Sequence, residues 1–157
     1  MDPSSPSVTT LKRSVVINAP IEEVFHFHDN SENLLKITPP HIKVSIEESG
    51  PAGVGHIVKL NVRQFGLFTM KWVVRFTDYT PPTYLSDEQI SGPFSYWKQE
   101  RLLETVEGGT ELTDVVHYKP PLGFLGAIAN SLFIRREVEK MFRHRQSATK
   151  TLLENAS

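Results

Sequence analysis

The chain has 157 residues, a formal net charge of −1 and no cysteine. This length suits one domain that buries about two-thirds of its unfolded surface, and the near-neutral charge argues against general nucleic-acid binding, which requires a basic surplus. A chain without cysteine has no disulfide, thiol nucleophile, zinc knuckle or iron–sulfur cluster, which fits a protein of the reducing cytoplasm.

The chain ends and the hydropathy pattern predict one domain and no membrane segment. Residues 1–10 are rich in Ser, Pro and Thr and lack the apolar run of a signal peptide. We therefore expect a short disordered tail over residues 1–10 and a single domain over residues 11–155. No run approaches the roughly 18 apolar residues that a membrane span requires.

The first predicted elements are one strand and two short helices. Residues 11–18 include three successive β-branched side chains, which favour a strand. Pro20 suits the first turn of a helix, and Ile21, Val24, Phe25 and His28 would share one face of it. A second short helix around residues 34–37 would end before Pro39 and Pro40.

Six runs of alternating apolar and polar residues follow and predict an antiparallel sheet. Turn residues separate them: Gly50–Gly53, Gly66, Pro81–Pro82, Gly92–Pro93 and Gly108–Gly109. The runs are residues 42–47, 58–63, 68–77, 84–91, 96–105 and 111–119.

The last element is a predicted helix from about residue 125 to residue 154. Apolar residues and one arginine recur there at steps of three and four, and Glu139 is placed to pair with Arg143. The periodic residues are Ile134, Val138, Met141, Arg145, Ala148 and Leu152. A helix of nearly thirty residues is about 40 Å long, so it must cross the whole sheet. We predict an α+β fold in which seven antiparallel strands wrap around this helix and leave a cavity beside it.

Polar side chains occupy the face of three strands that should be buried. In residues 96–105 the charged Lys98, Glu100 and Glu104 share one face, so the opposite face carries Trp97, Gln99, Arg101 and Leu103. The same alternation groups Leu85, Asp87 and Gln89, and it groups Leu112, Asp114, Val116 and Tyr118. Buried polar groups are costly unless paired. They either line a binding pocket or form a structural network in which Arg101 pairs with Asp87 or Asp114.

These residues resemble the helix-grip superfamily of START lipid-transfer domains, pollen-allergen-like proteins and aromatic polyketide cyclases (SRPBCC), and are most similar to its bacterial single-domain members. The resemblance spans roughly residues 11–153 and implies the fold and a pocket. Relatives often carry histidines where this chain has Gln99 and Arg101, so no role of those histidines is carried over. The matching residues are Ala19–Pro20, Val24–Phe25, Asn33–Leu34, Thr38–Pro40, Asp87, Gln89, Gly92–Phe94, Trp97, Gly108–Thr110, Asp114, Tyr118, Pro121, Gly123, Met141–Phe142 and Arg145.

Two functions remain open at this point. The first is binding, with or without transport, of a hydrophobic or aromatic small molecule or lipid. The second is an aromatase/cyclase- or dehydratase-type enzyme acting on a polyketide-like substrate, in which Arg101 or Tyr118 polarises a carbonyl and Asp114 or Asp87 moves a proton. We favour binding because the inward histidines of relatives are missing. The expected ligand contacts are Trp72, Asp87, Gln89, Phe94, Trp97, Gln99, Arg101, Asp114, Tyr118 and Met141.

No cofactor or metal site is expected. His26 and His28 are two residues apart on a predicted helix and diverge by about 200°, so they cannot bind one ion together. The chain has no glycine-rich phosphate loop and no serine-hydrolase signature.

The cations of the last helix suit a solvated face, with docking to a membrane or carrier protein as the alternative. The loops around residues 50–55, 64–67, 92–95 and 120–126 would gate or plug one end of the cavity.

Overall fold

The computed structural model describes residues 7–48, 53–64, 68–120 and 127–156. One strand, two short helices with a 3-10 turn between them, six further strands and a long helix follow one another along the chain. The elements are β1 (Thr9–Ile17), α1 (Ile21–Asp29), η1 (Ser31–Asn33), α2 (Leu34–Ile37), β2 (Ile42–Glu48), β3 (Ile57–Gln64), β4 (Phe68–Thr80), β5 (Tyr84–Ser91), β6 (Tyr96–Val106), β7 (Gly109–Lys119) and α3 (Ala127–Asn155).

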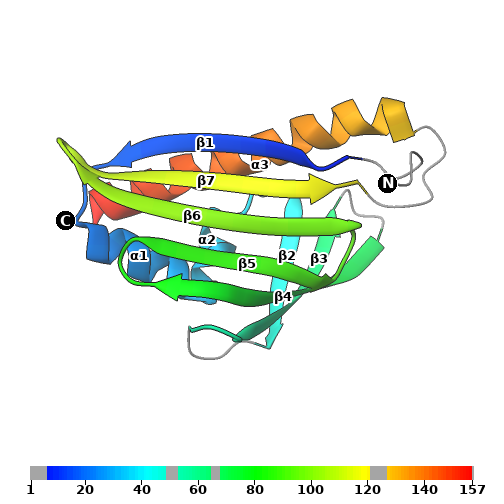
Figure 1. The fold of residues 1–157 in the computed structure, drawn as a ribbon, viewed down its shortest axis with the longest axis horizontal. Helices are drawn as coiled ribbons and strands as arrows, with labels where there is room; N and C mark the ends of the chain where they lie inside the picture. Colours follow the sequence, from blue (N-terminus) through cyan, green and yellow to red (C-terminus); the bar gives the residue numbers. More distant parts are fainter. Residues whose placement is uncertain (1–6, 49–52, 65–67, 121–126, 157) are drawn as a thin grey trace.

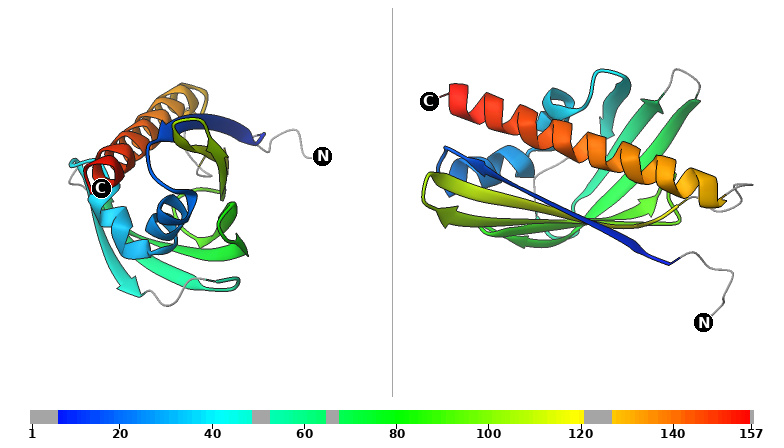
Figure 2. Two further views of the ribbon diagram at one scale, coloured as in Figure 1. Left: turned by 90° about the vertical axis from the view of Figure 1, so that its left-hand side faces the viewer. Right: turned by 90° about the horizontal axis from the view of Figure 1, so that it is seen from above.

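The seven strands form one antiparallel sheet in the order β1-β7-β6-β5-β4-β3-β2. The first strand therefore pairs with the last, Leu11 lying opposite Val116, while β2 forms the other edge (Figure 1). Seen end-on, the sheet curls into an incomplete barrel, and α3 runs across its open side (Figure 2). The predicted helix-grip architecture is confirmed.

Helix α1 closes one end of the curled sheet because its apolar face packs into it. Pro20 precedes the helix, and Glu22 and Glu23 occupy its first turn, where acidic residues complement the helix dipole. Val24 and Phe25 are completely buried. The side chain of Asn30 then accepts a hydrogen bond from the backbone N–H of Glu32, which starts the 3-10 turn.

The core has two parts. Beneath α1 it is aliphatic and includes Ile17, Leu85 and Leu112, all almost fully buried. Beneath the middle of α3 it is aromatic, with Trp97 stacked on Phe142 at a ring distance of 6.2 Å. The space between these two parts is where the polar residues of β5, β6 and β7 meet.

Most predicted boundaries lie within three residues of the observed ones, and some details differ. β1 begins at Thr9, inside the segment predicted as a tail. Leu152, expected on the packed side of α3, is 40% exposed, and the adjacent Leu153 packs against the core instead. Glu139 pairs with Arg135 at 3.3 Å rather than with Arg143. The predicted turns within residues 49–52 and 65–67, and the expected start of α3 at 125, lie outside the described residues.

The β6–β7 turn provides a test of the close approach between this hairpin and the end of β1. Gly108 and Gly109 both have positive φ, at +92° and +133°, but only a Cβ on Gly109 would collide with the carbonyl oxygen of Ile17. We expect G109A to destabilise the fold by on the order of 3 kcal/mol and G108A by about 1 kcal/mol. Denaturant unfolding measures both, and equal losses would show that the collision is relieved by a small backbone shift.

Candidate functional site

A cavity of about 120 Å³ lies between the concave face of the sheet, the α1–α2 segment and α3. Most of its wall is aliphatic or aromatic, from β2, β3, β4 and β6 together with α2. These wall residues are Leu34, Ile37, Ile42, Val44, Val58, Leu60, Val62, Trp72, Val74 and Trp97. Because apolar cavities on the order of 150 Å³ bind benzene, this space suits a group about the size of one aromatic ring.

One end of the cavity is polar. Its side chains come from four elements: His28 on α1, Asp87 on β5, Gln99 and Arg101 on β6, and Arg145 on α3. The sheet register explains their meeting, because Asp87 lies directly opposite Gln99 in the β5–β6 pair. Directly opposed side chains point to the same face of a sheet.

Asp114 is fully engaged behind this polar end. Gln99 donates to its Oδ1 at 3.2 Å, and Gln146 donates to its Oδ2 at 2.9 Å. The Nε of Arg101 lies 3.4 Å from Oδ1, within ion-pair distance but without the geometry of a hydrogen bond. Gln146 also donates to the backbone oxygen of Arg13 at 2.8 Å. This carboxylate therefore ties β6, β7 and α3 together, and Arg101 pairs with Asp114 and not with Asp87.

Asp87 differs from Asp114 in having no close partner. It is 8% exposed, and no described residue forms a hydrogen bond or ion pair with its carboxyl group. Burial raises the pKa of Asp87 to about 6, against the opposing charges of Arg101 and Arg145. A carboxyl group of this kind exchanges its proton near neutral pH.

Arg145 is the second cation of the site and lacks a counter-ion. Its guanidinium lies over the ring of Phe142, 5.4 Å from the centroid, and its Nε is buried without a hydrogen-bond partner. No carboxylate among the described residues lies within ion-pair distance of it. Burial lowers the pKa of Arg145 to about 10, so the side chain stays charged at neutral pH.

His28 is an inward-facing histidine that our sequence interpretation did not assign to the site. Its Nδ1 lies 2.7 Å from the carbonyl oxygen of Val24 and must carry the hydrogen, because a carbonyl only accepts. Burial, followed by the charge of Arg101, lowers the pKa of His28 to about 4. The ring is therefore neutral, with Nε2 as an acceptor. His28 comes from α1 and not from β6, and its place on the predicted helix face with Val24 and Phe25 is the sequence signal for its inward direction.

The remaining expected contacts form an aromatic cluster beside the cavity. Phe94 packs against Trp97 at 4.8 Å and Trp72 at 5.6 Å, and Tyr118 lies behind Trp97, 1% exposed. Gln89 holds this arrangement by donating to the backbone oxygen of Phe94 at 2.7 Å. The expected contacts that line the cavity are Trp72, Asp87, Trp97, Gln99, Arg101 and Met141, while Gln89, Phe94, Asp114 and Tyr118 lie next to it.

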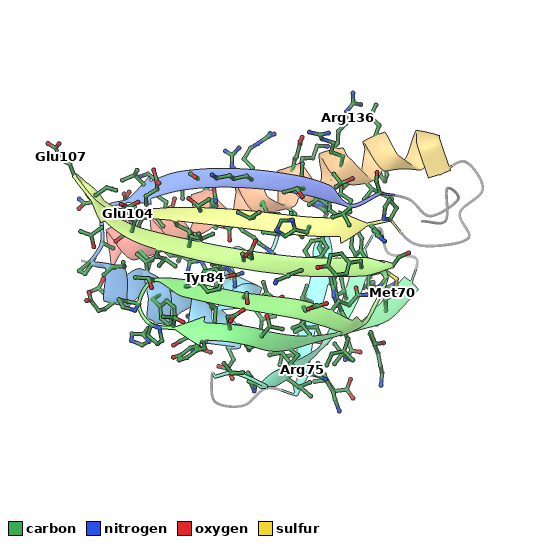
Figure 3. All side chains as sticks on the ribbon, in the orientation of Figure 1. Met70, Arg75, Tyr84, Glu104, Glu107 and Arg136 are labelled. Carbon is green, nitrogen blue, oxygen red and sulfur yellow. The ribbon has the colours of Figure 1, made fainter. Side chains whose placement is uncertain are left out.

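Other predicted features lie away from this site. Within the described ranges, no group of three or more His, Asp or Glu side chains is placed to hold a metal ion, and no helix there is both long and apolar enough to cross a membrane. On α3, Lys140 pairs with Glu137, and Arg136 points away from the sheet (Figure 3). Docking through this helix stays a prediction. Of the expected gate loops, residues 50–52, 65–67 and 121–126 fall outside the described residues.

The isolated carboxyl group of Asp87 predicts a pH-dependent cost of folding. Its pKa of about 6 lies above the unfolded value of 3.8, so its cost to folding is absent below the unfolded pKa, grows as pH rises between the two pKa values and is complete above the folded one. We expect D87N to be more stable than the native chain at about pH 7.5, by on the order of 2 kcal/mol, with the difference closing as pH falls from the folded pKa of about 6 to the unfolded value of 3.8. Denaturant titrations across this range test it. E88Q, on the other face of β5, is the control, and a constant difference between D87N and the native chain would contradict the prediction.

Comparisons with known proteins show which proteins share this fold. The family model described as polyketide cyclase/dehydrase and lipid transport matches residues 17–146. The solved structure of the Zhui aromatase/cyclase from Streptomyces sp. R1128 is similar, with a TM-score of 0.76 and 21% identity over 94% of each chain. Protein CV1439 from Chromobacterium violaceum has a TM-score of 0.73 and 18% identity, covering 93% of this chain and 98% of its own.

One more solved structure shares the fold as part of a longer chain. It is the di-domain aromatase/cyclase StfQ from the steffimycin biosynthetic pathway, with a TM-score of 0.76 and 9% identity over 96% of this chain and 52% of that one. A search of curated proteins found no match. Because the family model covers most of the 157 residues, this chain belongs to the polyketide cyclase/dehydrase and lipid transport family.

Proposed function

We propose that this protein binds a small hydrophobic or aromatic molecule, a lipid or polyketide-like compound included, in the cavity between the sheet and α3, and that it does so in the cytoplasm. The observation that carries the proposal is the composition of the cavity: an apolar wall that ends at buried donors without acceptors. The Nε of Arg145 and the Nε1 of Trp72 have no hydrogen-bond partner among the described residues, and both side chains line the cavity. Leaving such donors unpaired is costly, and a ligand oxygen would pair them.

The apolar wall would supply the affinity. Burying apolar surface contributes about 25 cal/mol per Å², and Leu60 on β3, Trp72 on β4 and Trp97 on β6 already form a wall from three strands. Asn30 is exposed at the end of α1 and also lines the cavity. The cavity therefore reaches the surface beside α1, and a ligand longer than one ring has a way out there.

An enzyme of the cyclase or dehydratase type is the second candidate. The observation that favours it is Asp87, whose carboxyl group exchanges a proton near neutral pH inside an apolar cavity. In this role Arg101 or Arg145 would polarise a substrate carbonyl and Asp87 would move the proton. Asp114 is less suited because three side chains already engage it. Burial raises the pKa of Tyr118, which stands behind Trp97.

Filling the cavity tests the proposed binding. Val44 lines the cavity from β2, and the next residue, Ser45, is exposed on the opposite face. We expect native mass spectrometry of the protein purified from its own host to show a bound small molecule, which V44F loses and S45F retains. Loss of the adduct in both variants, or in neither, would place the molecule elsewhere on the protein. A bare protein mass in every preparation would count against the proposal.

The same adduct separates binding from catalysis. If the protein only binds, the recovered molecule keeps its mass during incubation with fresh protein, and D87N recovers the same compound. If it is a dehydratase, the native chain removes one water from the molecule, and D87N accumulates the unreacted form because it lacks the titrating group.

A further inference from the structure

We propose that the ligand carries a carboxylate, which Arg145 binds as its counter-ion with Arg101 beside it, and that Asp87 takes up a proton when the ligand enters. This inference rests on the proposed binding function and names the chemical class of the ligand at the same cavity. Guanidinium groups match carboxylates through two parallel N–H donors.

The two neighbouring arginines of the site differ in their counter-ions. The Nε atoms of both arginines are buried without a hydrogen-bond partner among the described residues. Arg101 nevertheless has Asp114 at 3.4 Å, while the described part of the chain offers Arg145 no carboxylate within 4.0 Å. Removing a cation from water costs several kcal/mol unless an anion compensates it. Since Arg145 lines the cavity, a ligand carboxylate placed there would supply the compensation that the protein lacks.

Charged side chains from three neighbouring elements surround Asp87. Three charged groups act on it from the elements packed around β5: Arg101 on β6, Arg145 on α3 and Asp114 on β7. His28 on α1 lines the same cavity. Despite the two arginines, burial keeps the pKa of Asp87 at about 6. Asp87 is therefore a weak counter-ion for Arg145, because near neutral pH part of it is already protonated.

Entry of an anion would complete this protonation. A carboxylate beside Arg145 adds a negative charge near Asp87 and raises the pKa of Asp87 further. Asp87 then becomes neutral, and two guanidinium groups are balanced by Asp114 and the ligand. His28 does not interfere, because burial holds its pKa at about 4 and the ring stays uncharged.

A matched pair of probes tests the inference. Cinnamate and cinnamamide share one planar aromatic body and differ in charge. By calorimetric or NMR titration at about pH 6 we expect cinnamate to bind at least about tenfold more tightly, as hydrogen bonds to charged partners imply. The cinnamate affinity should fall as pH rises above about 6, the pKa of Asp87 in the free protein, because binding must then return a proton to Asp87.

Three variants locate the effect. R145M should abolish the preference for cinnamate without lowering stability, because the removed charge has no partner within ion-pair distance. R143M is the control: Arg143 is an exposed cation on the same helix, and the preference should survive its loss. D87N should bind cinnamate with no pH dependence above about pH 6. If R145M does not fold, this loss of pH dependence is the result that tests whether a carboxylate binds beside Asp87.

The outcomes distinguish failure of the carboxylate assignment from failure of the proposed binding function. Equal affinity for both probes in the native chain, or a pH dependence that persists in D87N, would overturn the carboxylate assignment and leave the proposed binding function intact. A preference that survives R145M would overturn the assignment to Arg145. Binding of neither probe would overturn the carboxylate assignment alone if the native-host adduct is still observed, and the proposed binding function with it if that adduct is absent.

Discussion

The carboxylate of Asp114 is the constraint on which the site depends. It is 6% exposed and engages Gln99 and Arg101 from β6 and Gln146 from α3. These partners offset the cost of burying this carboxylate, which would be several kcal/mol if it were unpaired. The contact between Gln146 and Asp114 fixes how α3 lies against the sheet. Because Arg145 is the residue before Gln146, the same contact also fixes where Arg145 faces the cavity.

The inward and outward faces of the sheet could be predicted from the sequence because side chains alternate along a strand with a period of two residues. Once Lys98 and Glu104 face water, Gln99 and Arg101 must face inward, and the register with β5 then brings Asp87 to the same place. Burial of Trp97, Gln99 and Leu103 follows the predicted alternation. The sequence thus identified the wall that carries the polar residues, although what those residues bind remains a proposal.

The pairing within the cluster could not be predicted in the same way. The alternation put Asp87 and Asp114 on one face and left both as partners of Arg101; only the three-dimensional arrangement shows that Asp114 takes that role. It also brings His28 from α1 and Arg145 from α3 to the same cavity. Their inward positions agree with the apolar faces of their helices, but a helical pattern does not show which strand faces a given turn. The missing counter-ion of Arg145 is a property of this tertiary arrangement alone.

The two titrating groups of the cavity act on stability in opposite directions. The pKa of His28 falls from 6.5 to about 4, so its contribution is present above pH 6.5 and is lost as pH falls toward 4. The pKa of Asp87 rises from 3.8 to about 6, so its cost of folding disappears over nearly the same interval as pH falls. Because the two contributions change with pH in opposite directions, they partly cancel in the stability of the free protein. A ligand that changes the charge near Asp87 removes this cancellation. Proton uptake on ligand binding therefore measures the protonation of Asp87 more directly than the pH dependence of folding stability does.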